Sequence, residues 1–239
     1  MNTITIAAIL ASLTLGCKDS NSDTESLEQR SVTIKFGHKV DDKPLAFDQL
    51  VFENAAGNQY SVSRLQYILT DMYLLDENGE KTIIISEKYI DASGDSSAET
   101  VTVPSTPTSL SFVFGISPAN KPDGLPDAMD FNNMVWPEAM GGGYHYMKLE
   151  GSYQNGDAGK AFLVHTGPTG GQDRSIDLQV TVPSDGSGDT FVLEMDINQW
   201  FEGDTNYDFK SYDGMIMGNP GAQEILRANG QNVFNLRAE

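Results

Sequence analysis

The feature that most constrains the fold is a series of short segments in which apolar and polar residues alternate. Residues 32–40 and 109–116 show the pattern clearly, because apolar side chains recur at every second position. A period of two puts alternate side chains on one face, so each segment is predicted to be a strand with one buried face. Further strands, separated by turns, are predicted at 60–76 (as two strands or one bulged strand), 81–90, 101–103, 144–153, 160–166, 175–182 and 190–197.

One clear helix is predicted over residues 220–229, because Pro220 stands at its start and Gly230 follows its end. Eight to ten short strands with one short C-terminal helix are typical of an all-β protein. The predicted fold is an Ig-like or Greek-key β-sandwich, or a partly closed barrel. Residues 117–143 are predicted to form its longest loop, and loops of that length are usually functional when they hold apolar residues.

The N-terminal residues are not predicted to belong to this domain. Residues 1–16 have the pattern of a lipoprotein signal peptide, since an apolar run too short to cross a bilayer ends directly before Cys17. Cys17 is the single cysteine of the chain and is expected to carry the lipid, although a plain signal peptide with an incidental cysteine is the alternative. Residues 17–30 are predicted to be an acidic tether, and residues 31–239 one domain.

Charge and motifs limit the classes of function. The chain has 34 acidic and 15 basic residues, a net charge of −19, which repels nucleic acid and anionic lipid headgroups. The charge favours cationic partners, metal ions included, but an ordinary acidic exported protein explains it equally well. The sequence contains no Gly-x-Ser-x-Gly, His-Glu-x-x-His or phosphate-binding glycine loop. We therefore expect a protein that is not an enzyme and does not bind nucleic acid.

The three histidines, His38, His145 and His165, each lie on or at the end of a predicted strand. The strand period places His38 and His145 in phase with apolar residues, and a buried imidazole needs a partner for each ring nitrogen. A shared metal ion would supply one. Imidazole and thioether groups together favour copper, as Cu(I) or Cu(II). Met134 and Met140, in the long loop beside Trp136, are the thioethers least typical of core packing, and Met134 is the candidate ligand.

Other interpretations of these residues stay open. The histidines can be structural and bonded separately, and the methionines can simply fill the core. Acidic turns leave calcium as a weaker alternative, although none has the spacing of an EF-hand loop; they are found at 91–95, 123–130 and 204–213.

A family resemblance is carried by the stretch from Asn133 to Gly151. Met134-Val-Trp136, followed by Gly143-Tyr-His-Tyr-Met-Lys-Leu-Glu-Gly151, resembles the MbnP-like family, exported proteins related to the one encoded beside methanobactin genes. Weaker matching elements extend the resemblance to roughly residues 31–236. They are Phe36 to Val40, Ser61 to Tyr67, Ile90-Asp91 and Phe162 to Gly167.

The resemblance implies a β-rich fold, bound copper, and a partner that is a dihaem cytochrome c peroxidase-like enzyme. Such a partner oxidises a family tryptophan to kynurenine. Carried over by motif, the ligand role falls on His38 and His165, with His145 third, and the modified residue is Trp136. The family often has a second tryptophan where this chain has Glu138. Trp136 precedes a proline, so its backbone is expected to be extended, with its ring in a loop where the partner's oxidising equivalents can reach it.

Together these observations predict a cell-envelope lipoprotein that binds one copper ion through histidines near one end of a β-sandwich. Its expected location is the outer membrane, facing the periplasm or the cell exterior, and it contacts the membrane through its lipid. Two other functions remain. One is a surface adhesion or scaffold module with structural histidines. The other is a calcium-stabilised carbohydrate-binding module that uses Trp136 and nearby tyrosines.

Overall fold

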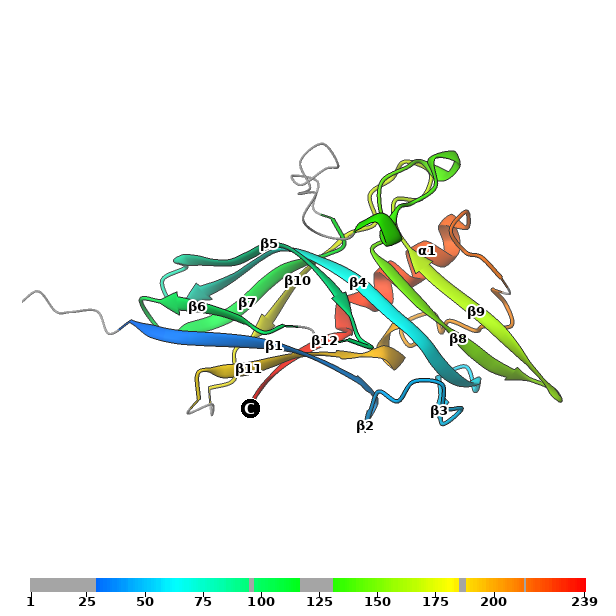
Figure 1. The fold of residues 1–239 in the computed structure, drawn as a ribbon, viewed down its shortest axis with the longest axis horizontal. Helices are drawn as coiled ribbons and strands as arrows, with labels where there is room; N and C mark the ends of the chain where they lie inside the picture. Colours follow the sequence, from blue (N-terminus) through cyan, green and yellow to red (C-terminus); the bar gives the residue numbers. More distant parts are fainter. Residues whose placement is uncertain (1–28, 95–96, 117–130, 185–187, 213) are drawn as a thin grey trace, which may run out of the picture.

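The computed structural model describes residues 29–94, 97–116, 131–184, 188–212 and 214–239. The predicted signal peptide, Cys17, most of the acidic tether and residues 117–130 of the long loop lie outside the described residues. In the described part of the chain, 12 strands form a five-stranded and a seven-stranded sheet (Figure 1). These sheets pack face to face and do not close into a barrel, so the predicted all-β sandwich is confirmed. No helix in the described ranges is long and apolar enough to span a membrane.

The first sheet is organised around β1 (Arg30–Val40), which pairs in parallel with β11 (Thr190–Asp196). Strands β2 (Lys43–Pro44) and β6 (Glu99–Val103) pair with β1 in antiparallel orientation. At the other edge, β12 (Phe234–Ala238) runs antiparallel to β11. The strand β12 is not predicted from the sequence, because five residues with two large apolar side chains give too short a periodic signal.

The second sheet is organised around β4 (Gln59–Asp76), an 18-residue strand. Shifts of register, for example between Val62 and Arg64, bend this strand, so the alternative of one bulged strand is confirmed over two separate strands. One edge of β4 pairs first with β8 and then with β7, and the other edge pairs with β5 and β3. The strands of this sheet besides β4 are β3 (Phe52–Glu53), β5 (Lys81–Asp91), β7 (Pro107–Phe114), β8 (Met147–Asn155), β9 (Ala158–Thr166) and β10 (Ile176–Thr181).

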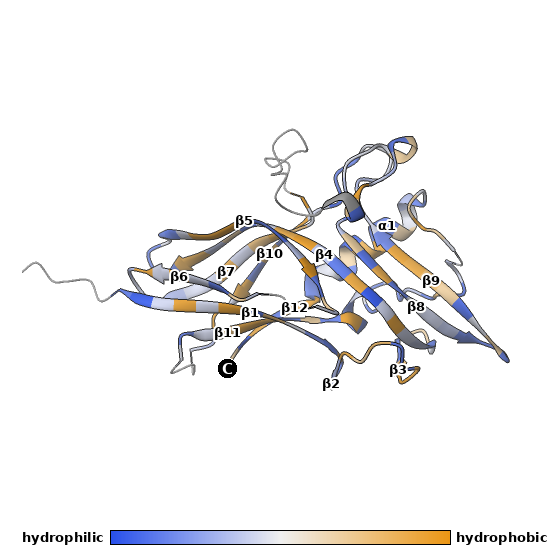
Figure 2. Cartoon of the chain, in the orientation of Figure 1, coloured by the Kyte–Doolittle hydropathy of each residue, from blue (hydrophilic) through white to orange (hydrophobic). Residues whose placement is uncertain are grey.

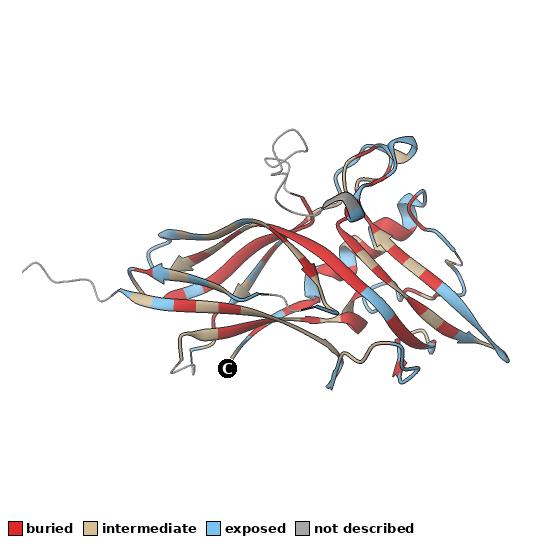
Figure 3. Cartoon of the chain, in the orientation of Figure 1, coloured by how far each residue is buried: buried red, intermediate tan, exposed pale blue. Residues whose placement is uncertain are grey.

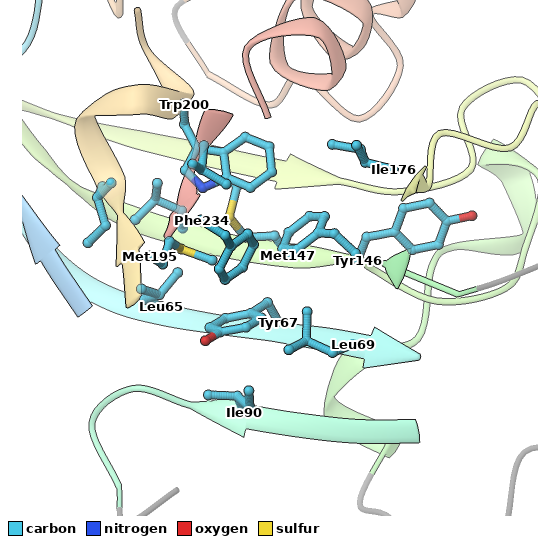
Figure 4. Close-up of a cluster of buried hydrophobic side chains, with 14 of the residues drawn as sticks. Leu65, Tyr67, Leu69, Ile90, Tyr146, Met147, Ile176, Met195, Trp200 and Phe234 are labelled. Atoms are coloured by element: carbon cyan, nitrogen blue, oxygen red, sulfur yellow. The ribbon is translucent and has the colours of Figure 1, made fainter. Parts of the chain in front are cut away.

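The hydrophobic core lies between the two sheets. Burial alternates along β8 residue by residue, while most of β4 is buried (Figure 3). Figure 2 shows the same alternation as bands of hydrophobic and hydrophilic residues along the strands. Figure 4 shows that both sheets supply side chains to the core. Among them are Leu65 and Tyr67 from the second sheet and Met195 and Phe234 from the first.

In the described residues, one α-helix and four short helical turns lie between strands along the chain. Helix α1 spans Pro220–Asn229, as predicted, and the side chain of Asn219 caps it by accepting a hydrogen bond from the Ala222 N–H. The short helical turn η4 (Ile197–Trp200) follows β11 directly, and η5 (Gly230–Asn232) links α1 to β12. Two further short turns, η2 (Phe131–Met134) and η3 (Glu138–Met140), lie in the described part of the long loop.

Candidate metal site

Two of the three histidines, His145 and His165, lie side by side on the second sheet. Their ring centroids are 4.9 Å apart, and the ring planes meet at 83°. His165 follows Val164 in β9, and Val164 belongs to the buried core. Because successive side chains of a strand point to opposite faces, His165 lies on the outer face of the sheet. Glu150 of β8, which bonds to the His165 ring, lies on that same face.

His145 lies beside His165 because the chain bends directly after His145. The sequence predicts a strand from residue 144, but the structure has a bend at Tyr146 and begins β8 at Met147. Tyr146 and Met147 are neighbours in sequence, yet both side chains belong to the buried core. The alternation of inward and outward side chains in β8 therefore does not extend back from Met147 to His145. The structure differs here from the sequence prediction, which placed His145 on the face of Met147.

Hydrogen bonds fix the tautomers of both imidazoles. His165 Nε2 lies 2.8 Å from Oε1 of Glu150, and His145 Nδ1 lies 3.2 Å from the backbone oxygen of Met134. A carbonyl oxygen only accepts hydrogen bonds, and so does an ionised carboxylate, so the nitrogen facing each oxygen carries the proton. The lone pairs then lie on Nδ1 of His165 and Nε2 of His145. Metal-binding histidines usually have this arrangement, with the second ring nitrogen bonded to a carboxylate or carbonyl group.

The two nitrogens that carry the lone pairs have no hydrogen-bond donor facing them among the described residues. Nε2 of His145 and Nδ1 of His165 are both buried and have no hydrogen-bond partner among the described residues. Buried polar atoms are normally paired, and leaving one unpaired costs about 1–3 kcal/mol. Two such atoms on adjacent rings are suited to bind one metal ion as a shared ligand pair.

Burial keeps both imidazoles neutral near pH 7. It lowers the pKa of His145 to about 4, with a smaller contribution from the neighbouring His165. Burial also lowers the pKa of His165, while the hydrogen bond to Glu150 opposes that shift. Neutral imidazole is the form that binds a metal ion, so neither ring has to lose a proton to become a ligand.

Trp136 borders the histidine pair. Its ring centroid is 4.8 Å from that of His145, and its side chain is 0% exposed. The indole Nε1 donates to the backbone oxygen of Met140, at 3.3 Å. A Cβ atom at Gly167 would lie 2.5 Å from Cε3 of Trp136, so this position requires a glycine. The loop folds back and buries the Trp136 ring, and the expectation that a partner's oxidising equivalents reach this ring stays a prediction.

Three consecutive glycines allow the loop to reverse direction between Trp136 and His145. Gly141, Gly142 and Gly143 have φ angles of 114°, 68° and 93°, in the left-handed region that favours glycine. After this turn, the Trp136 N–H donates to the Gly143 oxygen at 2.8 Å, and the His145 N–H to the Met134 oxygen at 2.6 Å. The turn therefore brings Trp136 and His145 together.

Charged side chains on the outer face hold the site in place. Arg64 Nη1 lies 3.0 Å from the Glu150 Oε1 atom that also bonds to His165. Lys148 donates to the backbone oxygen of Asn133, and the Asn133 side chain donates to Gln66 at 3.4 Å. These contacts attach the start of the loop to β4 and β8. Arg64 and Gln66 belong to the Ser61-to-Tyr67 element of the family resemblance, but no local pattern indicates their role.

The other two predicted ligands lie in different environments. His38 is in β1 of the first sheet, and its Nε2 is 3.0 Å from the hydroxyl oxygen of Tyr67. Met134 is fully buried in the core, and it is its backbone oxygen that contacts His145. Of the described residues, no three His, Cys, Asp or Glu side chains form a group that could hold a metal ion. The structure therefore joins His145 to His165, and does not join His38 to either.

Two of the predicted acidic turns each have one carboxylate that accepts local hydrogen bonds. Asp91 accepts from the Ser93 backbone N–H and hydroxyl, and Asp208 accepts from Lys210 and Ser211. Both are Asx-type turns, which these residues form commonly. The predicted turn at 123–130 lies outside the described residues.

Comparison with known proteins gives two matches. A family model described as MbnP matches residues 29–218 of the chain. The solved structure of MbnP from Methylosinus trichosporium matches with a TM-score of 0.56 and 14% sequence identity, covering 88% of this chain and 99% of that one. At this identity the structural match shows that the two proteins share a fold. No curated protein matches the chain.

Proposed function

We propose, from the premise that this chain belongs to the MbnP family, that it is a copper-binding protein of the cell envelope. Nε2 of His145 and Nδ1 of His165 would hold one copper ion between them. The observation that carries the proposal is that both nitrogens are buried and unpartnered among the described residues, while the opposite nitrogen of each ring is bonded to an oxygen. A shared metal ion would satisfy both atoms at once.

The donor chemistry favours copper over the other common metals. Calcium and magnesium require oxygen ligands, whereas both free donors here are imidazole nitrogens. Structural zinc takes four ligands in a closed tetrahedral site, and Trp136 occupies one side of this pair with an apolar ring. Imidazole suits copper, and Cu(I) in particular is stable with few ligands.

We propose that Trp136 is converted to kynurenine by a dihaem cytochrome c peroxidase-like partner. Two oxygen atoms would add across the C2–C3 double bond of the indole, that bond would break, and hydrolysis would release C2 as formate. The oxidation removes four electrons from the indole; two molecules of hydrogen peroxide would accept them and be reduced to water, and water would supply the two added oxygen atoms. Because the ring is fully buried, the partner would have to remove electrons through the protein. The new amine and ketone groups would bring a further donor beside His145.

Peptide mapping of protein purified from native cells tests this conversion. We expect the peptide containing Trp136 to show the mass of kynurenine, while protein made without the haem partner keeps an unmodified tryptophan. An unmodified Trp136 in native protein would remove the conversion from the proposal and leave the two-histidine site.

Export and lipid attachment at Cys17 complete the proposal. The support is the sequence alone, namely an apolar run that ends at Gly16-Cys17. A stable membrane anchor needs more than one acyl chain, as a lipidated N-terminal cysteine would supply. Replacing Cys17 with Ala should release the protein from the membrane fraction, and a variant that stays there contradicts the anchor.

Thermal unfolding with and without Cu(I) tests the metal site. At a free Cu(I) concentration 100 times its dissociation constant, the wild-type fold should gain about 2.7 kcal/mol. His145→Ala and His165→Ala should each lose this gain, because each removes one of the two donors. His38→Ala is the matched control: it also removes a histidine from a strand but should keep the full copper-dependent gain.

The pattern of results separates the proposed function from its alternatives. If His145→Ala and His165→Ala keep the copper-dependent gain, these histidines are structural and the adhesion or scaffold function takes precedence. If wild-type protein responds to calcium and binds glycans but does not respond to Cu(I), the carbohydrate-binding module is the better account.

A further inference from the structure

The side chain of Gln223, in helix α1, binds the end of β9 next to the candidate site. It is 1% exposed. Its Nε2 donates to the backbone oxygen of His165 at 2.7 Å and to that of Ile216 at 3.4 Å. Its Oε1 accepts from the Gly167 N–H at 3.3 Å. One amide group thus bonds to the backbone on both sides of Thr166.

This contact has the hydrogen-bond pattern of a paired strand. The backbone oxygen of Thr166 faces β8, where it accepts from the Tyr146 N–H at 2.7 Å. A residue in a parallel strand on the other edge of β9, opposite Thr166, would bond to the backbone oxygen of His165 and to the N–H of Gly167. The Gln223 side-chain amide makes these same two bonds. Met215 already forms a parallel bridge with Leu163. The Gln223 amide therefore continues that pairing along the free edge of β9.

Two of the three residues that Gln223 binds, His165 and Gly167, belong to the site. His165 supplies one lone-pair nitrogen, and Gly167 packs directly against Trp136. We infer that Gln223 is a positioning residue for the copper site, which acts by fixing the backbone at His165 and Gly167. This inference rests on the proposed function. Gln223 lies beyond residues 29–218, which the family model matches.

The test variant is Gln223→Met, which keeps the length of the side chain but removes all three hydrogen bonds. Loss of a residue that orients a metal ligand typically lowers metal affinity about 10- to 100-fold. We expect a loss in that range for Cu(I), measured by competition with a colorimetric Cu(I) chelator on protein whose near-UV circular dichroism matches the wild type. The Cys17→Ala background allows these measurements in soluble form.

The matched control is Asn229→Leu in the same helix. Asn229 is also buried, and its Nδ2 donates to the backbone oxygens of Trp200 and Thr205 at 3.1 and 3.3 Å, away from the histidine pair. The Asn229→Leu substitution should lower the melting temperature without lowering Cu(I) affinity. If Gln223 has only a structural role, Gln223→Met should behave like this control and lower the melting temperature alone. Affinity within twofold of wild type in folded Gln223→Met overturns the inference.

A measurement on wild-type protein covers the case in which Gln223→Met does not fold. Coupling between two sites is reciprocal, so Cu(I) binding should slow amide hydrogen exchange in helix α1. Unchanged exchange in α1 on copper binding also overturns the inference. If wild-type protein binds no Cu(I), the proposed function fails first. If it binds Cu(I) and α1 or Gln223→Met shows no effect, only the role of Gln223 fails.

Discussion

His38 and His145 are both imidazoles whose pKa is lowered by burial to about 4, yet their hydrogen bonding differs. Nε2 of His38, on the first sheet, lies 3.0 Å from the hydroxyl oxygen of Tyr67, so this nitrogen has a hydrogen-bond partner within the protein. Nε2 of His145 is buried on the other sheet and has no partner among the described residues. Burial and a lowered pKa are therefore common to both histidines, and the unpaired buried nitrogen is what distinguishes His145 from His38.

The surroundings of the two histidines differ in the same way. Tyr67, the partner of His38, packs in the core against Phe114 and Phe234, with ring centroids 6.0 and 6.1 Å apart. His145 has Trp136 and His165 as ring neighbours, outside that aromatic group. We therefore expect the core to determine the stability of the fold, and the outer-face site to determine metal affinity. Three changes test this separation.

The largest effect is expected from Phe114→Ala. Phe114 is 1% exposed and packs against Tyr67, Trp200 and Phe234. Removing a buried aromatic ring leaves a cavity and typically costs about 3–5 kcal/mol. Chemical denaturation should show this loss, while Cu(I) affinity of the folded variant stays at the wild-type value. A parallel loss of affinity would show that core and site are not separate.

Acid should lower stability through His38. The folded-state pKa of His38 is about 4, below the unfolded value of 6.5, so its contribution is complete above pH 6.5 and is lost as the pH falls towards 4. The loss should be roughly 1–3 kcal/mol. Unfolding experiments on metal-free protein between pH 7 and pH 4 measure it.

His38→Gln supplies the comparison for this prediction. The glutamine does not titrate, so the variant should lose less stability than the wild type over the same pH range. Copper should not change that difference, because His38 is not a proposed ligand. Identical pH profiles for the two proteins would contradict the assignment to His38.

The smallest effect is expected from Glu150, which orients His165 through Nε2. Glu150→Ala removes the oxygen that fixes the tautomer and should weaken Cu(I) binding about tenfold, or about 1.4 kcal/mol. Glu150→Gln keeps an amide oxygen that can accept the same hydrogen bond and should recover most of the affinity. Chelator competition measures both. Equal affinities for Glu150→Ala and the wild type would exclude this orienting role.

Much of the fold could be predicted from the sequence. Helix α1 has the predicted bounds, because Pro220 and Gly230 mark its ends locally. The alternating segments 32–40 and 109–116 became β1 and β7, with small differences at their ends. These elements follow from the period of the side chains and from residues that start or stop a helix. Such signals are contained in a few neighbouring residues.

The pairing within the site could not be predicted in this way. The family resemblance puts His38 and His165 first and His145 third, and the strand period extended to residue 144 places His145 on the apolar face. The bend at Tyr146 arises from tertiary contacts, since the aromatic ring packs into the core and its hydroxyl donates to Asp173 at 2.9 Å. Glu150 and Gln223 were missed for the same reason. Their roles depend on contacts between strands and helix that no local pattern indicates.

The left-handed glycine turn also bears on the order of folding. Trp136, His145 and His165 all lie in one continuous piece of chain, a loop followed by the β8–β9 hairpin. By contrast, β1 must find β11 across the sequence, with Thr33 paired to Thr190. Local contacts cost less loop-closure entropy and form faster than distant ones. We infer that the nascent hairpin can acquire copper before the first sheet assembles. Copper should then accelerate protection of β8 and β9 in pulsed hydrogen exchange and leave that of β1 and β11 unchanged; acceleration of both would contradict this order.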